Sequence, residues 1–423
     1  MEVETVILPC DPYSISFEEH GENVIPVISS LDTRRALEDA CSILKKGLQP
    51  IAFPTETVYG LGALALNHDA VLRIFSTKGR PADNPLIVHV STLSMLKRIL
   101  PPSYTLSPLY QSLIKSFWPG PLTLLFPITH SSLIPTSVTA GHETVAIRIP
   151  SHPIARALIA LCDEPLAAPS ANSSGRPSPT RAEHVYRDLN GKIKCILDGG
   201  PSQVGLESTD GHLRVLRPGG ITVEQLESVV ASHDESQDGA RTRQPTKVLV
   251  HRRDYKDEDI EAAPTTPGMK YRHYAPSSPV ILLMDPSRLI VELPLSLTET
   301  GQKPIAAQTV RSFLAALFSS SDRRSTKLGL LLTSDSPYLT PFNAALSTCT
   351  FYCRHEYKVH LLGTSNTPQV TAQRLFDGLL SLDNDGVDVI IAESIPETHE
   401  GLAIMNRVRK AAGETRYVLP VVD

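Results

Sequence analysis

The chain has 423 residues, which is enough for two or three domains with hydrophobic cores of their own. Its formal net charge of −5 and its sequence pI of about 6.3 argue against a large basic surface for nucleic acid, although a local basic patch is compatible with both values. No apolar run approaches membrane-spanning length, so the sequence predicts no membrane contact.

The six cysteines are scattered, several of them within apolar runs, as expected of reduced core residues in an intracellular protein. The segment CTFYCRH at 349–355 has no second Cys or His pair to complete a metal site, so packing is favoured and no metal ligand is predicted. The acidic N-terminal segment lacks the features of a targeting peptide. Together these features predict a cytoplasmic protein, with a mitochondrial fraction left open.

Residues 24–232 alternate helix-like and strand-like patterns and form the first predicted domain. The strand-like runs are 50–53, 85–90, 122–127, 144–150, 165–169 and 193–197. The helix-like runs are 33–46, 70–75, 108–117, 153–162 and 181–189. Because some strands follow one another after short turns, we expect an α/β domain with a twisted mixed sheet.

A polar stretch without apolar periodicity begins near residue 231, and 233–278 is predicted to be a linker. Its PGMKYRHYAP segment combines prolines with tyrosines and basic residues, which suggests that it docks on another surface. In 279–423, apolar runs at 280–285, 328–334, 358–363 and 387–394 alternate with helical patterns at 310–319, 371–382 and 403–412. This alternation predicts a smaller, Rossmann-like domain with a parallel sheet covered on both faces.

Four clusters of cations and hydroxyl groups lie at strand ends of the first domain. In the first cluster, PTETVYGLG at 54–62 is followed by a loop that carries Lys78 and Arg80. Two solvated cations on a turn are the ordinary interpretation of such a pair. The rigid Pro81 and the dipeptide Asn84–Pro85 favour a fixed anion site instead, with lysine as a point charge and arginine as a planar fork.

The second and third clusters also leave two interpretations open. PSANSSGRPSPT at 169–180 follows a strand and precedes a helix, so it is either a phosphate cradle or an ordinary polar loop, and it lacks the Walker A ending. In AGHETVAIRIP at 140–150, Arg148 shares one strand face with Thr144 and Ala146. An arginine in such surroundings needs an anionic partner, which is either a structural carboxylate or a ligand carboxylate.

The fourth cluster, GLESTDGHLRVLRPGG at 205–220, adds Ser208, Thr209 and Arg217, with a surface turn as the alternative for the RPGG segment. No Ser-His-Asp order, HExxH motif or pair of CxxC motifs accompanies the four clusters. This inventory favours binding and charge stabilisation of a polyanion such as a nucleotide over covalent catalysis.

In order and at compatible spacing, the runs PTETVYGLG, KGRPADNPLIVH, VAIRIP, APSANSSGRPSPT, ESTD, RPGG and PGMKYRHYAP resemble those of the threonylcarbamoyl-AMP synthases, also called the YrdC family. GLAIMNRVRKAAG at 401–413 is similar to the end of the accessory domain in the long, two-domain members. The resemblance implies synthesis of L-threonylcarbamoyladenylate and pyrophosphate from L-threonine, bicarbonate or CO2, and ATP, with Mg2+ bound through the phosphates. A separate threonylcarbamoyl transferase complex would then modify adenosine 37 of tRNAs that read ANN codons, and a weak contact with tRNA is left open.

The resemblance also implies roles for particular residues. The threonine pocket would consist of Thr55, Thr57, His89, Arg148, Ala168 and Ser208. ATP would be bound by Lys78, Arg80, Asn84, Thr144, Ser170, Ser178, Arg217 and Tyr274, the last of which belongs to the linker and would act as a lid. Lys78, Arg80 and Arg148 are the predicted catalytic residues. No general base is assigned, because a polar pocket wall is the favoured role for His89.

Two other functions stay open at this point. The bases Lys270, Arg272 and His273, interleaved with Tyr271 and Tyr274, also suit an RNA-binding module without nucleotide turnover. Tight, salt-sensitive RNA binding would favour that module. Carbamoyl transfer, as in hydrogenase-maturation relatives with a similar domain, is disfavoured because those proteins carry zinc-finger-like cysteine pairs that this sequence lacks.

Overall fold

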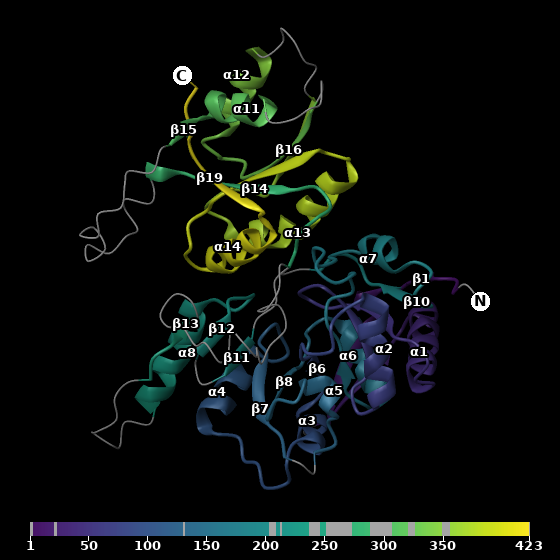
Figure 1. The fold of residues 1–423 in the computed structure, drawn as a ribbon. Coiled ribbons are helices and arrows are strands. Elements are labelled where there is room, and N and C mark those ends of the chain that lie inside the picture. The colour runs from purple at the N-terminus through teal and green to yellow at the C-terminus, as the bar shows by residue number, and fades with distance from the viewer. Residues whose placement is uncertain are drawn as a thin grey trace. The chain divides into compact units, whose positions relative to one another are not determined.

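The chain forms two compact units, Met1–Tyr271 and Arg272–Asp423, each built around a sheet of its own (Figure 1). The computed structural model describes residues 3–20, 23–129, 132–202, 209–211, 214–236, 246–250, 273–287, 307–319, 326–348 and 356–422. The finer division into 24–232, 233–278 and 279–423 stays a prediction.

The described part of the first unit contains an eleven-stranded sheet in the order β1-β10-β4-β5-β9-β6-β8-β7-β11-β12-β13. Its strands are β1 (Val6–Pro9), β4 (Ile51–Pro54), β5 (Tyr59–Leu64), β6 (Ile87–His89), β7 (Leu124–Pro127), β8 (Thr144–Arg148), β9 (Leu166–Ala167), β10 (Cys195–Asp198), β11 (Thr209–Gly211), β12 (Arg214–Arg217) and β13 (Leu249–Val250). A separate hairpin joins β2 (Ile15–His20) and β3 (Asn23–Ile28). Because β6 and β8 are parallel whereas β7 and β8 are antiparallel, the predicted mixed sheet is confirmed.

Eight helices are described in this unit, and several of them begin at a side-chain cap. They are α1 (Leu31–Lys45), α2 (His68–Lys78), α3 (Leu93–Ile99), α4 (Pro108–Phe117), α5 (Thr136–Thr139), α6 (Pro153–Cys162), α7 (Ala182–Leu189) and α8 (Val223–Ser236), with a 3-10 turn at Pro12–Ser14. In α2, the Asn67 side chain accepts from the Ala70 N–H, and Gly79 ends the helix at a φ of 62°. Glycine adopts this left-handed conformation without strain, so the chain turns sharply just after Lys78.

The structure differs from the predicted elements of the first domain at several places, including the following three. Strand β1 precedes residue 24 and extends the sheet by pairing with β10. The predicted strand at 165–169 is reduced to Leu166–Ala167, since proline at either end has no N–H for the ladder. Helix α8 continues to Ser236, inside the predicted linker, where the His233 ring bonds the Ser112 hydroxyl at 3.2 Å. A polar contact with α4 thus holds the end of α8, although the composition of this segment resembles that of a linker.

The cysteines in the described residues match their predicted state. Cys10, Cys41, Cys162 and Cys195 are free and buried, as expected of reduced core residues. The CTFYCRH segment at 349–355 lies outside the described residues. Nowhere in the described chain is a helix both long enough and apolar enough to cross a membrane.

The second unit contains a six-stranded sheet in the order β15-β19-β14-β18-β16-β17. Its strands are β14 (Val280–Met284), β15 (Gln308–Thr309), β16 (Lys327–Leu332), β17 (Glu356–Leu361), β18 (Val389–Glu393) and β19 (Glu414–Leu419), and its helices are α11 (Val310–Ser319), α12 (Leu339–Thr348), α13 (Pro368–Asn384) and α14 (Glu400–Ala411). All pairings are parallel, and α11 with α12 covers one face while α13 with α14 covers the other (Figure 1). The predicted Rossmann-like parallel sheet is therefore confirmed.

Two glycines of the PTETVYGLG run face the fully buried ring of Phe53, and they provide a matched test of packing in this unit. A Cβ atom on Gly62 would lie 2.5 Å from the ring, whereas one on Gly60 would find its nearest neighbours at an ordinary 3.4 Å. We expect Gly62→Ala to lower the free energy of unfolding by about 1–3 kcal/mol, because overpacking forces the ring to move. Gly60→Ala should cost less, and equal losses in urea unfolding would contradict this packing.

Candidate active site

Arg148 is the centre of a buried polar cluster. It ends β8, directly opposite His89 on β6, and only 3% of it is exposed. Its Nε donates to His89 Nε2 at 2.9 Å, and its Nη2 donates to the hydroxyls of Thr55 and Thr57, each at 3.1 Å. Arg148 therefore contacts three other residues of the predicted threonine pocket.

The two threonines are held by the hairpin loop between β4 and β5. Pro54 pairs with Tyr59, so residues 55–58 form a tight four-residue loop. The Thr55 hydroxyl donates to the Val58 carbonyl at 2.6 Å and lies 2.9 Å from the Thr57 hydroxyl. Because the Thr55 proton goes to Val58, Thr57 donates to Thr55. The loop thus aligns two hydroxyl oxygens as acceptors for the guanidinium.

His89 orients Arg148 instead of adding charge. Its burial and the neighbouring Arg148 charge hold the pKa of the imidazole well below the usual 6.5, so the ring is neutral at physiological pH. Since Nε2 accepts from Arg148, the single ring proton resides on Nδ1. The ring also packs edge-on against Phe53, with 6.4 Å between centroids. A neutral, packed acceptor fixes the plane of the guanidinium.

Glu56 is a member of this cluster that the sequence did not single out. Its carboxylate is buried, with Oε1 3.6 Å from Arg148 Nη1 and Oε2 accepting from the Ser151 N–H at 3.1 Å. The structural carboxylate left open for Arg148 is therefore present. The only signal in the sequence was the place of Glu56 between two hydroxylic residues of one motif.

Lys78 lies in the last turn of α2 and is 5% exposed, which rules out a solvated cation on a turn. Its ammonium donates to the backbone carbonyls of Ser170 and Asn172, the latter at 2.5 Å. The Asn172 side chain in turn donates to the carbonyls of Ser173 and Arg176. The predicted lysine and the predicted loop 169–180 are thus joined into one unit, and the carbonyls hold the lysine without cancelling its charge.

Three other predicted residues, Arg80, Ala168 and Ser178, belong to the same unit as Arg148 and Lys78. The Arg80 guanidinium donates to the backbone carbonyls of Pro85 and Asn84, at 3.2 and 3.4 Å. The Ala168 N–H donates to the Ile87 carbonyl at 2.9 Å, which places Ala168 beside β6. Ser178 is 1% exposed. It precedes Pro179, whose carbonyl accepts from the Tyr59 N–H on β5.

The remaining predicted residues lie at other places in the fold or outside the described residues. Thr144 begins β8, and Arg217 ends β12, with β7 and β11 between these two strands. Arg217 is 1% exposed, so the surface-turn alternative does not apply to its side chain. Tyr274 belongs to the second unit, where its ring lies 5.1 Å from that of Phe376. Ser208 lies outside the described residues.

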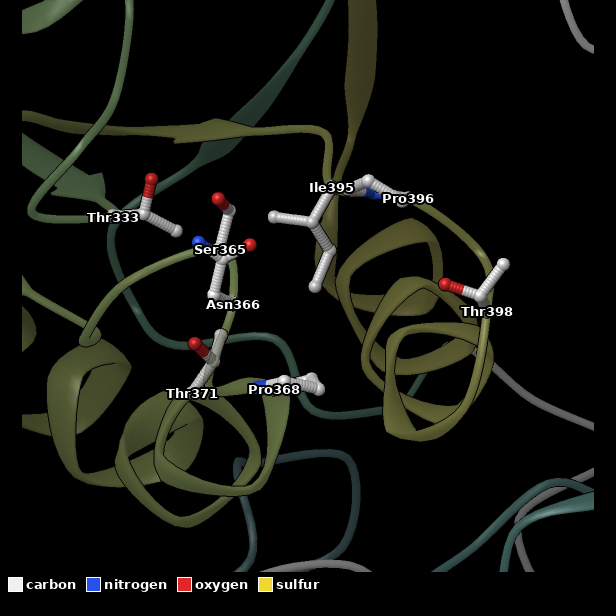
Figure 2. A pocket seen from close by; sticks show the side chains of 8 residues that line it. All are labelled: Thr333, Ser365, Asn366, Pro368, Thr371, Ile395, Pro396 and Thr398. Carbon is white, nitrogen blue, oxygen red and sulfur yellow. The ribbon is translucent and has the colours of Figure 1, made fainter.

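A separate cavity of about 230 Å³ lies in the second unit, beyond the carboxyl ends of β16 and β18 (Figure 2). It is lined by Thr333, Ser365, Asn366, Pro368, Thr371, Ile395, Pro396 and Thr398. No residue of the predicted site lines this cavity, and its lining carries no charged side chain. It is therefore distinct from the cluster around Arg148.

The first unit thus combines an α/β fold with a buried arginine fork, aligned hydroxyls and a lysine fixed in a hydroxylic loop. These features are typical of anion-binding α/β proteins. A family described as telomere recombination matches residues 42–219, and one described as the C-terminal domain of threonylcarbamoyl-AMP synthase matches 221–413.

Relatives extend the match over nearly the whole chain. The chain is 41% identical to the threonylcarbamoyl-AMP synthase of Schizosaccharomyces pombe, over 97% of this chain and 98% of that protein. It is 40% identical to that of Pyrococcus abyssi, over 88% and 93%. The crystal structure of P. abyssi Sua5 complexed with L-threonine superposes with a TM-score of 0.70 at 35% identity, covering 98% of this chain and all of that one. The chain belongs to the threonylcarbamoyl-AMP synthase family.

Proposed function

We propose that this protein is an L-threonylcarbamoyladenylate synthase, a nucleotidyltransferase that makes threonylcarbamoyl-AMP and pyrophosphate from L-threonine, bicarbonate or CO2, and ATP. The product would serve the N6-threonylcarbamoyladenosine modification at position 37 of tRNAs that read ANN codons, through a separate threonylcarbamoyl transferase complex. The full-length family match supports the activity. The observation in the molecule that carries the proposal is the buried Arg148 fork beside the hydroxyls of Thr55 and Thr57.

The contacts of this cluster suit an amino acid as one substrate. A guanidinium binds a carboxylate through parallel N–H bonds, and burial strengthens that interaction. Arg148 would therefore hold the threonine carboxylate, with its plane set by His89. Ala168 and Ser208 complete the proposed pocket. The hydroxyls also offer a partner for the threonine hydroxyl, which would discriminate against valine.

The features around Lys78 suit ATP as the second substrate. The amine of threonine adds to CO2 to give a carbamate, and a carbamate oxygen then attacks the α-phosphate of ATP with release of pyrophosphate. Negative charge develops on the phosphate oxygens during this step, and fixed cations stabilise it. Lys78, Arg80 and Arg217 would serve the phosphates, together with Asn84, Thr144, Ser170 and Ser178. A lid role for Tyr274, whose ring packs near Phe376 of the second unit, stays a prediction.

The phosphates themselves would carry the Mg2+ ion. Among the described residues, no group of three or more His, Cys, Asp or Glu side chains is placed to hold a metal ion. In nucleotide-binding sites Mg2+ usually keeps several waters and is bound by the substrate phosphates together with one or two carboxylates. Bound there, the ion would neutralise phosphate charge. The chain's own cations act beside it.

The proposed activity is tested by product analysis. The protein is incubated with ATP, Mg2+, labelled bicarbonate and a panel of amino acids, and the products are identified by mass spectrometry. We expect label in an adenylate only when threonine is present, with pyrophosphate released alongside. Adenylate that forms equally with valine, or no labelled adenylate at all, would contradict the proposal.

The RNA-binding alternative has no specific observation in its favour. Lys270, Tyr271 and Arg272 lie outside the described residues, and the Tyr274 ring is 6% exposed and packed near Phe376. A buried ring offers no face for base stacking. A weak tRNA contact and a cytoplasmic location stay predictions.

A further inference from the structure

Three buried atoms of the Arg148 cluster lack hydrogen-bond partners in the described structure: Arg148 Nη1, Glu56 Oε1 and His89 Nδ1. The first two lie 3.6 Å apart as a loose ion pair. The other atoms of these two groups are bound: Arg148 through Nε and Nη2, and Glu56 through Oε2 to the Ser151 N–H. Buried charged groups almost always complete their hydrogen bonds, so an incomplete donor and an incomplete acceptor side by side require an explanation.

A ligand with an anionic and a cationic group close together would provide a hydrogen-bond partner for both Arg148 Nη1 and Glu56 Oε1. An α-amino acid has this form, since one carbon atom carries both its carboxylate and its ammonium group. The carboxylate would take the Nη1 donor of Arg148, and the ammonium group would donate to Oε1 of Glu56. Both protein groups are fixed: the guanidinium by His89 and the two threonines, and the carboxylate by the Ser151 backbone.

We propose that Glu56 is the residue that binds the α-ammonium group of the amino-acid substrate, next to the carboxylate held by Arg148. This assignment rests on the proposed function, because it takes L-threonine as the ligand. It gives the site a preference for a zwitterion over a simple hydroxy acid. A charge-assisted hydrogen bond of this kind is worth on the order of ten-fold or more in affinity.

The competing explanation is purely structural: Glu56 compensates the buried charge of Arg148 and ties the 55–58 loop to Ser151. In that case removing the carboxylate would change the affinity for every carboxylate ligand by the same factor. The two explanations therefore differ in a ratio of affinities, which does not depend on how well Arg148 itself is held.

The experiment measures the dissociation constants of L-threonine and of (R)-3-hydroxybutanoate by calorimetry, without ATP. The second ligand keeps the carboxylate, the hydroxyl and the methyl group but has hydrogen in place of the ammonium group. Wild type is compared with Glu56→Gln, which retains the shape of the side chain and loses its charge. Glu183→Gln, on the exposed face of α7, is the matched control. Glu56→Asp, which retracts the carboxylate, replaces Glu56→Gln if the latter does not fold.

We expect wild type and the control variant to prefer threonine, and Glu56→Gln to lose at least about five-fold of that preference. A smaller change, with both ligands weakened or strengthened equally, would overturn the assignment and leave Glu56 a structural role. Because the binding assay involves no turnover, its result is independent of the product analysis. A protein that binds threonine but forms no adenylate would refute the proposed function alone.

Discussion

Replacing Arg148 by alanine is expected to reduce threonine-dependent pyrophosphate release by about 30- to 5,000-fold in kcat/KM. Removing one partner of a buried, hydrogen-bonded charge pair costs about 2–5 kcal/mol, which corresponds to that range. His89, Thr55 and Thr57 accept hydrogen bonds from this guanidinium and Glu56 pairs with it, and the substrate carboxylate would lose its charged partner. The measurement is a coupled pyrophosphate assay at varied threonine concentration.

Stability must be followed in the same variant, because the truncation leaves the buried Glu56 carboxylate without its counter-charge. Arg148→Lys separates the two effects, since it keeps the charge but lacks the planar fork. We expect it to fold better than Arg148→Ala and still to lose activity. Arg98→Ala removes an arginine that is half exposed and paired with Asp163, and it should retain wild-type activity. Full activity in a folded Arg148→Ala protein would refute the role of this residue.

Replacing Lys78 by alanine is expected to lower kcat by about 10²- to 10³-fold, the usual loss when one fixed electrostatic contact to a developing charge is removed. The lysine is buried and held by two backbone carbonyls of the 169–180 loop, so its charge has a fixed position. Fixed charges stabilise a transition state without a reorganisation cost during the reaction. Pyrophosphate release with saturating threonine measures the effect.

A second readout shows whether Lys78 acts on phosphate or only supports the loop. If it acts on phosphate, Lys78→Ala should bind threonine without ATP as tightly as wild type does. Lys115→Ala, on an exposed position of α4, is the control for removal of a positive charge. A Lys78→Ala protein that turns over normally, or that has lost threonine binding altogether, would contradict the assignment of Lys78 to the nucleotide.

Much of the fold follows from local patterns. The helix at 153–162 begins with proline at its first turn, and the helices at 108–117 and 310–319 coincide with their predicted bounds. The apolar runs of the second domain became buried central strands such as β16 and β18. By contrast, β19 (Glu414–Leu419) was not predicted, since its exposed polar residues carry no apolar period. Backbone pairing with β14 and β15 makes it a strand.

The site divides in a similar way. Motifs identified Thr55, Thr57, His89 and Arg148 as members of one pocket, and the structure brings these four together. The contacts of Glu56 were not foreseen, because a carboxylate in a polar motif is most often solvated, and only burial beside Arg148 distinguishes it. The roles of all the predicted site residues toward ATP or threonine, those of Arg217, Ser208 and Tyr274 included, stay predictions.

By itself the sequence determined the family, the mixed and parallel sheets and the residue types available for binding anions, because these depend on motifs and on short-range periodicity. Only the tertiary structure decided which side chains meet. Arg148 reaches Thr55 and Thr57 across 93 and 91 positions of the chain, through the register of β6 with β8 and the hairpin of β4 with β5. Such a register is set by pairing between distant strands, which no local pattern encodes.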